Sequence, residues 1–296
     1  MFGSFSLGRA FGIPIYVHWS FFFLPAWMVA LHWGNWLAAA FGLAVLLSIF
    51  ACVLLHELGH ALMARWFGIP TSDITLYPIG GVARLQSAGD RPLQEIAIAL
   101  AGPAVNLVLV LALTPLILLA LLAGWLVEPG QLLGEITPEA FLGAYLLSLW
   151  LGNGILLVFN LIPAFPMDGG RVLRALLSLA MGRLPATELA AGIGLILALV
   201  LGVVGLLSGN WSLTLVALFV ALAGQTELSS LRAYLQLRQP EAVTVVTVPP
   251  YFPYTPFGSP TSPYGPTSSR GFTGLAWDPY RGVWVRWVNG RPVSIL

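Results

Sequence analysis

The residues best suited to chemistry are His56, Glu57 and His60, which form the pattern His-Glu-Leu-Gly-His. On a helix, residues four positions apart share one face, with Cβ atoms about 6 Å apart, so both imidazoles can bind one metal ion. A zinc ion bound in this way lowers the pKa of a water molecule to about 7, and a neighbouring carboxylate can then accept a proton from that water. The residue types and their spacing therefore predict zinc-dependent hydrolysis of peptide bonds.

The motif lies within an apolar stretch that is long enough to cross a lipid bilayer. Between residues 42 and 68, the motif contains the only acidic or basic residues before Arg65. A charge near the bilayer centre costs about 3 kcal/mol on insertion scales, so such groups usually serve a function and face a partner or a cavity. On a soluble helix the same pattern is often a solvated surface that binds no metal. An apolar stretch offers no solvated face, and this favours the metal-binding interpretation.

The composition is that of an integral membrane protein. Of the 296 residues, 58% are hydrophobic and only 8% are charged, and the mean hydropathy is +0.87, which is unlike a soluble domain of this length. Apolar runs of spanning length cover residues 15–33, 37–67, 94–124, 140–162, 189–208 and 211–231. We therefore expect an all-α polytopic protein with about six transmembrane helices. A signal peptide is the alternative for the first run, but no small-residue cleavage site follows it.

The charged residues predict how the spans are oriented. All 13 basic residues are arginines, and with six spans every one before residue 240 lies on the same side of the membrane. These are Arg9, Arg65, Arg84, Arg91, Arg171, Arg174, Arg183, Arg232 and Arg238. The positive-inside rule then predicts a multi-pass protein of the cell membrane with both termini in the cytoplasm. His56 would lie about 15 Å from the cytoplasmic end of its helix.

Two histidines and a water molecule leave a zinc ion one protein ligand short, so a third ligand is expected near another span. Asp168 is the only acidic residue between Glu139 and Glu188, and it follows two prolines that end the fourth span. The alternative for Asp168 is an N-cap of the helix that begins near Gly169. Cys52 shares a helix face with His56, but it lies about 12 Å along the helix from His60 and is expected to be a packing residue.

Two sequence elements together resemble the site-2 proteases, which are intramembrane zinc metalloproteases. They are HELGH at 56–60 and NLIPAFPMDGG at 160–170, with weaker matches in GGVARL at 80–85 and AGPAVNL at 101–107. The resemblance extends over roughly residues 5–238. It implies one zinc ion per chain, held by His56, His60 and Asp168, with Glu57 as the catalytic base.

The resemblance also suggests how a substrate is held. It implies that Asn160 helps to position the substrate or the developing oxyanion, although Asn160 could instead cap the broken helix. Residues 72–88 are expected to form a small β-hairpin at the membrane face, around Gly80 and Gly81. In the family such a segment is regarded as an edge on which an extended substrate pairs, and a plain connecting hairpin is the alternative. Gly102, Pro103 and Asn106 are expected to pack around the site.

The composition changes after the last predicted span. Residues 1–239 are expected to form the membrane core, and residues 240–270, rich in Pro, Tyr, Ser and Thr, a flexible linker. Residues 271–296 alternate in the manner of three short strands with an Asn-Gly turn. Such a small β element is marginal alone, so we expect it to lean on the membrane or on a partner. PDZ and CBS domains, which relatives often carry, are not recognisable.

The predicted function is regulated intramembrane proteolysis, with transmembrane proteins as substrates, membrane lipid as the surroundings and no nucleic acid as a partner. The rival interpretations are a catalytically inactive protease-like protein that acts in protein interaction, and a protein that binds or transports metal. Transport predicts ionisable residues along several spans, which are nearly absent outside this site. An inactive relative is expected to lack Glu57 or a ligand, and none is missing.

Overall fold

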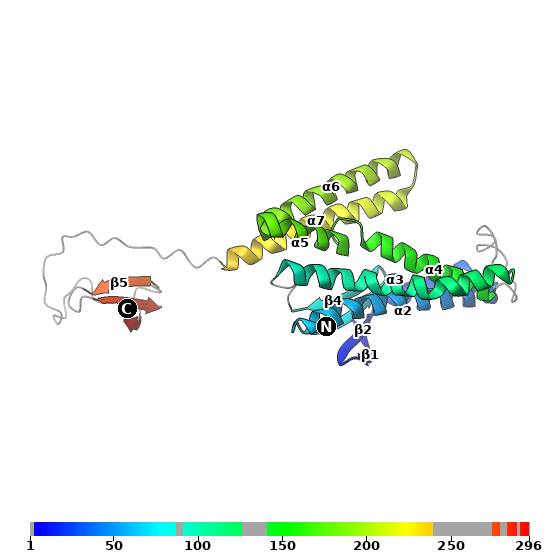
Figure 1. Ribbon diagram of the computed structural model, residues 1–296, viewed down its shortest axis with the longest axis horizontal. Coiled ribbons are helices and arrows are strands. Elements are labelled where there is room, and N and C mark those ends of the chain that lie inside the picture. Colours follow the sequence, from blue (N-terminus) through cyan, green and yellow to red (C-terminus); the bar gives the residue numbers. More distant parts are fainter. Residues whose placement is uncertain are drawn as a thin grey trace. The chain divides into compact units, whose positions relative to one another are not determined.

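The computed structural model describes residues 3–86, 91–125, 141–238, 274–278, 283–288 and 291–295. It separates into two compact units, Met1–Leu231 and Arg232–Leu296, which are treated one at a time. The first unit is a set of long helices with a small sheet at its N-terminal side, and the second contains a three-stranded sheet (Figure 1).

The helices of the first unit have the length and composition of membrane spans. They are α1 (Phe23–Leu31), α2 (Trp36–Trp66), α3 (Pro92–Leu122), α4 (Phe141–Asn160), α5 (Asp168–Met181), α6 (Arg183–Leu207) and α7 (Trp211–Arg238). Among the described residues, five helices are long and apolar enough to cross a bilayer, namely α2, α3, α4, α6 and α7. At 1.5 Å per residue, α2 and α3 are each about 46 Å long and exceed the hydrocarbon core of about 30 Å. The predicted polytopic helical architecture is confirmed.

The structure differs from the prediction over residues 15–33, which were expected to form the first span. This region contains the end of strand β2 (Ile13–His18), a short 3₁₀ helix η1 (Trp19–Phe22) and α1. In β2 the side chains of Ile13, Ile15 and Val17 are buried, at the spacing of two that a strand requires. A count of apolar residues does not distinguish the spacing of two in a strand from the periodicity of a helix. Residues 15–33 therefore resemble a membrane span in the sequence.

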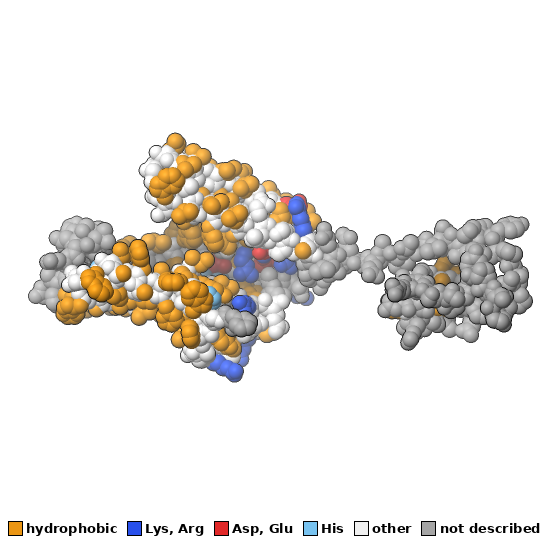
Figure 2. Space-filling model, turned by 180° about the vertical axis from the view of Figure 1, so that it is seen from behind, with side chains coloured by type: hydrophobic (Ala, Val, Ile, Leu, Met, Phe, Trp, Pro, Cys, Tyr) orange, Lys and Arg blue, Asp and Glu red, His pale blue; other side chains and the backbone are white. Residues whose placement is uncertain are grey.

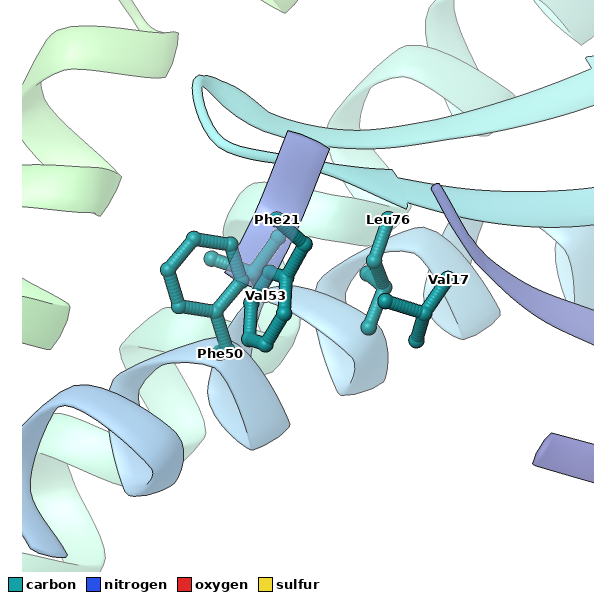
Figure 3. Close-up of a cluster of buried hydrophobic side chains, with 5 residues drawn as sticks. All are labelled: Val17, Phe21, Phe50, Val53 and Leu76. Atoms are coloured by element: carbon teal, nitrogen blue, oxygen red, sulfur yellow. The ribbon is translucent and has the colours of Figure 1, made fainter. Parts of the chain in front are cut away.

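The same segment nevertheless runs antiparallel to much of α2. Ile13 lies in a buried cluster with Leu58 near the end of α2. The rings of Phe21 and Phe50 meet edge to face, with centroids 4.7 Å apart, in a second cluster (Figure 3). Further along the segment, Met28 lies beside Gly42, near the start of α2. The orientation of the spans stays a prediction.

The sheet of the first unit has the order β1-β2-β3-β4, with β1 at Ser4–Ala10, β3 at Thr71–Tyr77 and β4 at Gly80–Leu85. Strands β2 and β3 are parallel, and the other pairs are antiparallel. The hairpin predicted for residues 72–88 corresponds to β3 and β4, whereas β1 and β2 were not expected. The sheet packs on α2, where Ile74 of β3 contacts Leu58 and Ala61 of the helix. This packing places the end strand β4 beside Glu57 of α2.

The chain turns sharply between α4 and α5. Residues 161–167 contain Pro163 and Pro166, which cannot continue a helix, and α5 begins at Asp168. An added Cβ at Gly169 would overlap the carbonyls of residues 161 and 162, and one at Gly170 would lie 2.5 Å from the carbonyl carbon of Ala164. Only glycine therefore lets the turn fold back over the first turn of α5.

The second unit contains the antiparallel sheet β5 (Gly274–Asp278), β6 (Val283–Val288) and β7 (Arg291–Ile295), in that order. These are the three strands that the sequence predicts for residues 271–296. Trp277 and Trp284 are cross-strand neighbours whose rings pack at 5.4 Å, and Val285 is buried on the other face. The predicted linker 240–270 lies outside the described residues.

Candidate metal centre

Three predicted ligands meet at one point between α2 and α5. His56 and His60 lie one turn apart on α2, with their Nε2 atoms 3.0 Å from each other. Oδ2 of Asp168, at the start of α5, lies 3.2 Å from Nε2 of His56 and 3.1 Å from Nε2 of His60. All three residues are buried, at 5%, 4% and 7% exposure. One ligand atom from each lies within 4.8 Å of the others, close enough for all three to bind one metal ion.

The other ring nitrogen of each histidine has a hydrogen-bond partner on α3. Nδ1 of His60 donates to the carbonyl of Ile98 at 2.7 Å, and Nδ1 of His56 donates to Oδ1 of Asn106 at 2.5 Å. A carbonyl oxygen can only accept, so the proton of each ring lies on Nδ1, and the lone pair on Nε2 points into the site. Such partners fix the orientation of metal-binding imidazoles.

Asn106 is itself held by α4. Its Nδ2 donates to Oδ1 of Asn153 at 2.9 Å, and Nδ2 of Asn153 donates to the carbonyl of Leu149 at 2.8 Å. Both asparagines have 0% exposure. Because the amide groups are oriented by these bonds, Asn106 presents its oxygen and not its nitrogen to His56. This chain of hydrogen bonds connects α2, α3 and α4 around the site.

The geometry fits a bound cation. Two imidazole lone pairs and a carboxylate face one another, and Oδ2 of Asp168 is buried without a hydrogen-bond partner. Buried polar atoms are normally paired, so this arrangement needs a positive charge at its centre. Two histidine nitrogens and one carboxylate oxygen are ligands that zinc commonly binds, with a further position left for water. Asp168 is not the N-cap of α5, which is Met167, so its carboxylate is available for such a role.

Gly102 on α3 makes room for the two imidazoles. A Cβ at this position would overlap Nε2 of His60 and lie 2.7 Å from Nε2 of His56. Helix α2 approaches α3 closely at Gly59, where a Cβ would lie 2.7 Å from the carbonyl oxygen of Ala101. Small residues at both positions thus allow the helices to approach closely at the site. The expectation that Gly102 and Asn106 only pack around the site underestimated them, because both contact or orient the ligands.

Glu57 follows His56 on α2, and its carboxylate contacts β4. Oε2 of Glu57 accepts a hydrogen bond from the backbone N–H of Ala83 at 3.1 Å. A Cβ at Gly81 would lie 2.5 Å from Cγ of Glu57, so the side chain passes directly over this glycine. Glu57 is only half-buried, unlike the three ligands. It therefore lies at the border between the buried site and the sheet.

The remaining predicted site residues are not among the three clustered side chains. Asn160 is the last residue of α4, and its Nδ2 donates to the carbonyl of Leu156 at 3.0 Å. This bond corresponds to the capping alternative. Gly80 begins β4 with a φ of 141° and has no atom within 4 Å of an added Cβ. Sγ of Cys52 lies 3.4 Å from Nδ2 of Asn153, as an acceptor in the hydrogen-bonded chain.

An ion cluster around the buried Arg174 connects α5 to two other helices. The guanidinium of Arg174 donates to the carboxylate of Glu95 in the first turn of α3 and to that of Glu227 in α7. Burial disfavours the charged form of Arg174, but the two carboxylates raise its pKa above the usual value. The same guanidinium lies 5.1 Å from the ring centroid of Phe165, in the turn that leads to Asp168.

Comparisons with known proteins agree with this site. Residues 44–141 and 126–201 match the model of peptidase family M50. The chain is 37% identical over 224 residues to a zinc metalloprotease of Methanocaldococcus jannaschii, covering 76% of this chain and 60% of that protein. It is 34% identical over 149 residues to the stage IV sporulation protein FB of Bacillus subtilis, covering 48% and 45%. The chain thus spans less than two thirds of the length of these curated relatives.

A solved structure covers most of the same region. The site-2 protease from Methanocaldococcus jannaschii is 35% identical, and the match covers 76% of this chain and 95% of that one, with a TM-score of 0.51. The family match includes α2, α5 and the cluster of His56, His60 and Asp168. The chain is therefore a membrane-embedded member of peptidase family M50, within the site-2 protease group.

Proposed function

We propose that this protein is an intramembrane zinc metalloprotease that hydrolyses peptide bonds in or beside transmembrane segments of other proteins. The observation that carries the proposal is the set of three buried ligand atoms, including the unpaired Oδ2 of Asp168. Glu57 directly follows the ligand His56 on α2. His56, His60 and Asp168 hold one zinc ion per chain. The membership of family M50 and the names of its relatives support the same activity.

Each residue of the site has its own role in the proposed reaction. When bound, zinc would act as a Lewis acid, which makes a water molecule nucleophilic near neutral pH and polarises the scissile carbonyl. The carboxylate of Glu57 accepts the proton of the attacking water and later gives it to the leaving amine. Asn160, at the end of α4, exchanges its bond to Leu156 for one to the substrate carbonyl. The carbonyl of Ile98 and the amide of Asn106 hold the imidazoles in the required tautomer.

The surroundings of the site support a membrane-protein substrate. Hydrophobic side chains cover the helices of the first unit, and charged side chains gather toward one end (Figure 2). Arg65 at the end of α2 donates to the carbonyl of Phe11 at 2.8 Å, so Arg9 and Arg65 lie at the same end. We assign this end, and both termini, to the cytoplasm. An extended segment of the substrate pairs along β4, the end strand of the sheet, near Gly80 and Gly81.

The first prediction separates metal binding from catalysis. Glu57→Gln keeps the size of the side chain and removes the base, so zinc content should be unchanged while cleavage of a transmembrane substrate falls by about 10³-fold. Asp168→Ala should lose both zinc and activity. Metal analysis of the purified proteins and gel-based cleavage in detergent micelles measure the two quantities. Near-normal cleavage by the Glu57→Gln variant would contradict the assigned base, and undiminished zinc in Asp168→Ala would contradict the assigned ligand.

A further inference from the structure

The edge of β4 supplies a hydrogen-bond donor to the side chain of Glu57. Strand β4 is the last in the sheet order, and its residues pair with β3 on one side only. In an antiparallel pair, alternate residues direct their N–H groups away from the partner strand. The N–H of Ala83 is one of these, and it donates to Oε2 of Glu57 at 3.1 Å. The strand edge is therefore occupied at this point by a side chain of α2.

Gly81 lies two residues earlier on the same strand and limits the space around the same side chain. An added Cβ at this position would lie 2.5 Å from Cγ, 3.2 Å from Cδ and 3.3 Å from Oε1 of Glu57. A separation of 2.5 Å between carbon atoms is well below van der Waals contact, so any larger residue would displace the glutamate. The affected atoms include the carboxylate carbon, and the displacement would therefore move the group that takes part in proton transfer.

We propose that Gly81 and the backbone N–H of Ala83 are positioning groups that hold the carboxylate of Glu57 in its working orientation. This inference rests on the role of Glu57 as the base in the proposed function. With Oε2 held by Ala83, Oε1 is the oxygen that serves proton transfer. A glutamate side chain has several rotatable bonds, and a fixed acceptor removes the need to order them during the reaction. The absence of a side chain at Gly81 then makes room for the base, and this role is separate from the pairing of a substrate backbone along β4.

The contact itself can be tested without activity. In the full-length, zinc-loaded protein in detergent micelles, amide hydrogen exchange is measured with single-residue resolution. Glu57→Gln keeps a carbonyl oxygen that can accept from Ala83, so exchange at this amide should stay slow. Glu57→Ala removes the acceptor, so exchange at Ala83 should rise at least about tenfold while the amides of β3 keep their rates. Equal rates at Ala83 in the wild type and Glu57→Ala, or acceleration throughout β3, would overturn the proposal.

The effect on catalysis is tested with Gly81→Ala and a matched control, Gly192→Ala. Gly192 lies on α6, where an added Cβ meets no atom within 4 Å, so this substitution should change little. Gly81→Ala should keep its full zinc content and a normal KM, while kcat falls by about 10²-fold, the usual effect of a misplacement of about 1 Å. A raised KM with normal kcat would assign Gly81 to substrate binding and overturn the proposal. If the wild type cleaves no transmembrane substrate, the proposed function fails, and the exchange measurement still decides whether Ala83 holds Glu57.

Discussion

At the scale of single residues, the site depends as much on the partners of the ligands as on the ligands. One ring nitrogen of His60, Nδ1, donates to the carbonyl of Ile98, and the other, Nε2, faces the carboxylate of Asp168. The imidazole of His56 is held in the same way by Asn106. Both rings also lie against Gly102, where no side chain intervenes. The orientation of the Nε2 lone pairs is thus set before any ion binds, which lowers the entropic cost of binding.

This arrangement predicts a specific effect of one methyl group. Gly102→Ala places a Cβ in the space of His60 Nε2, so the rings must turn and zinc affinity should fall by at least about 100-fold. Competition with a chromogenic chelator measures this affinity. The matched control is Gly154→Ala on α4, where an added Cβ meets nothing within 4 Å. The control should keep its affinity, and a loss of similar size in both variants would show that the cost lies in the helices and not in the site.

At the scale of elements, α5 must be fixed for Asp168 to face the histidines. Arg174 connects α5 to Glu95 on α3 and Glu227 on α7. The side chain of Glu95 is 5% exposed, whereas that of Glu227 is 40% exposed. Removal of one partner from a buried ion pair leaves an uncompensated charge, and the cost is far greater than at a solvated position. The two carboxylates therefore differ in their contribution to stability.

The carboxylate of Glu95 on α3 should accordingly contribute more to stability than that of Glu227. Glu95→Gln is expected to lower the free energy of unfolding by about 3 kcal/mol, because Arg174 then keeps only its half-exposed partner. Glu227→Gln is expected to cost about 1 kcal/mol or less. Denaturant unfolding of the metal-free proteins in mixed micelles measures both values. Equal losses of unfolding free energy in the two variants would contradict the prediction that the more buried ion pair contributes more to stability.

The sequence predicts those elements whose signals are local. The spacing of His56 and His60 and the position of Asp168 after two prolines suffice to predict that these three side chains meet, because each pattern is confined to a few residues. The bond between His56 and Asn106 joins residues 50 positions apart, and it depends on how α2 and α3 cross. Strand β2 was mistaken for part of a span because its buried Ile15 and Val17 add to the same apolar count as a helix.

At the scale of the whole molecule, the metal site and the described C-terminal sheet belong to different compact units. The ligands and the residues that orient them all lie within Met1–Leu231. The unit Arg232–Leu296 contains its own sheet, with Trp277 and Trp284 half exposed on one face. Tryptophans of this kind are common where protein meets lipid or another protein. We propose that residues 1–239 carry catalysis, and that residues 271–296, following the segment 240–270, bind the membrane surface or a partner.

Truncation after Arg238 tests this division, because it keeps α7 complete and removes only the segment that follows. The shortened protein should keep its zinc content and cleave a minimal transmembrane peptide at a rate within about twofold of the full chain, since no described contact of the ligands comes from residues beyond α7. Its association with liposomes or with a full-length substrate should weaken. Trp277→Ala combined with Trp284→Ala in the full chain is the matched control, and it should reproduce the weakened association without affecting zinc. A truncated protein that inserts into membranes and folds but lacks zinc would instead place the tail within the active structure.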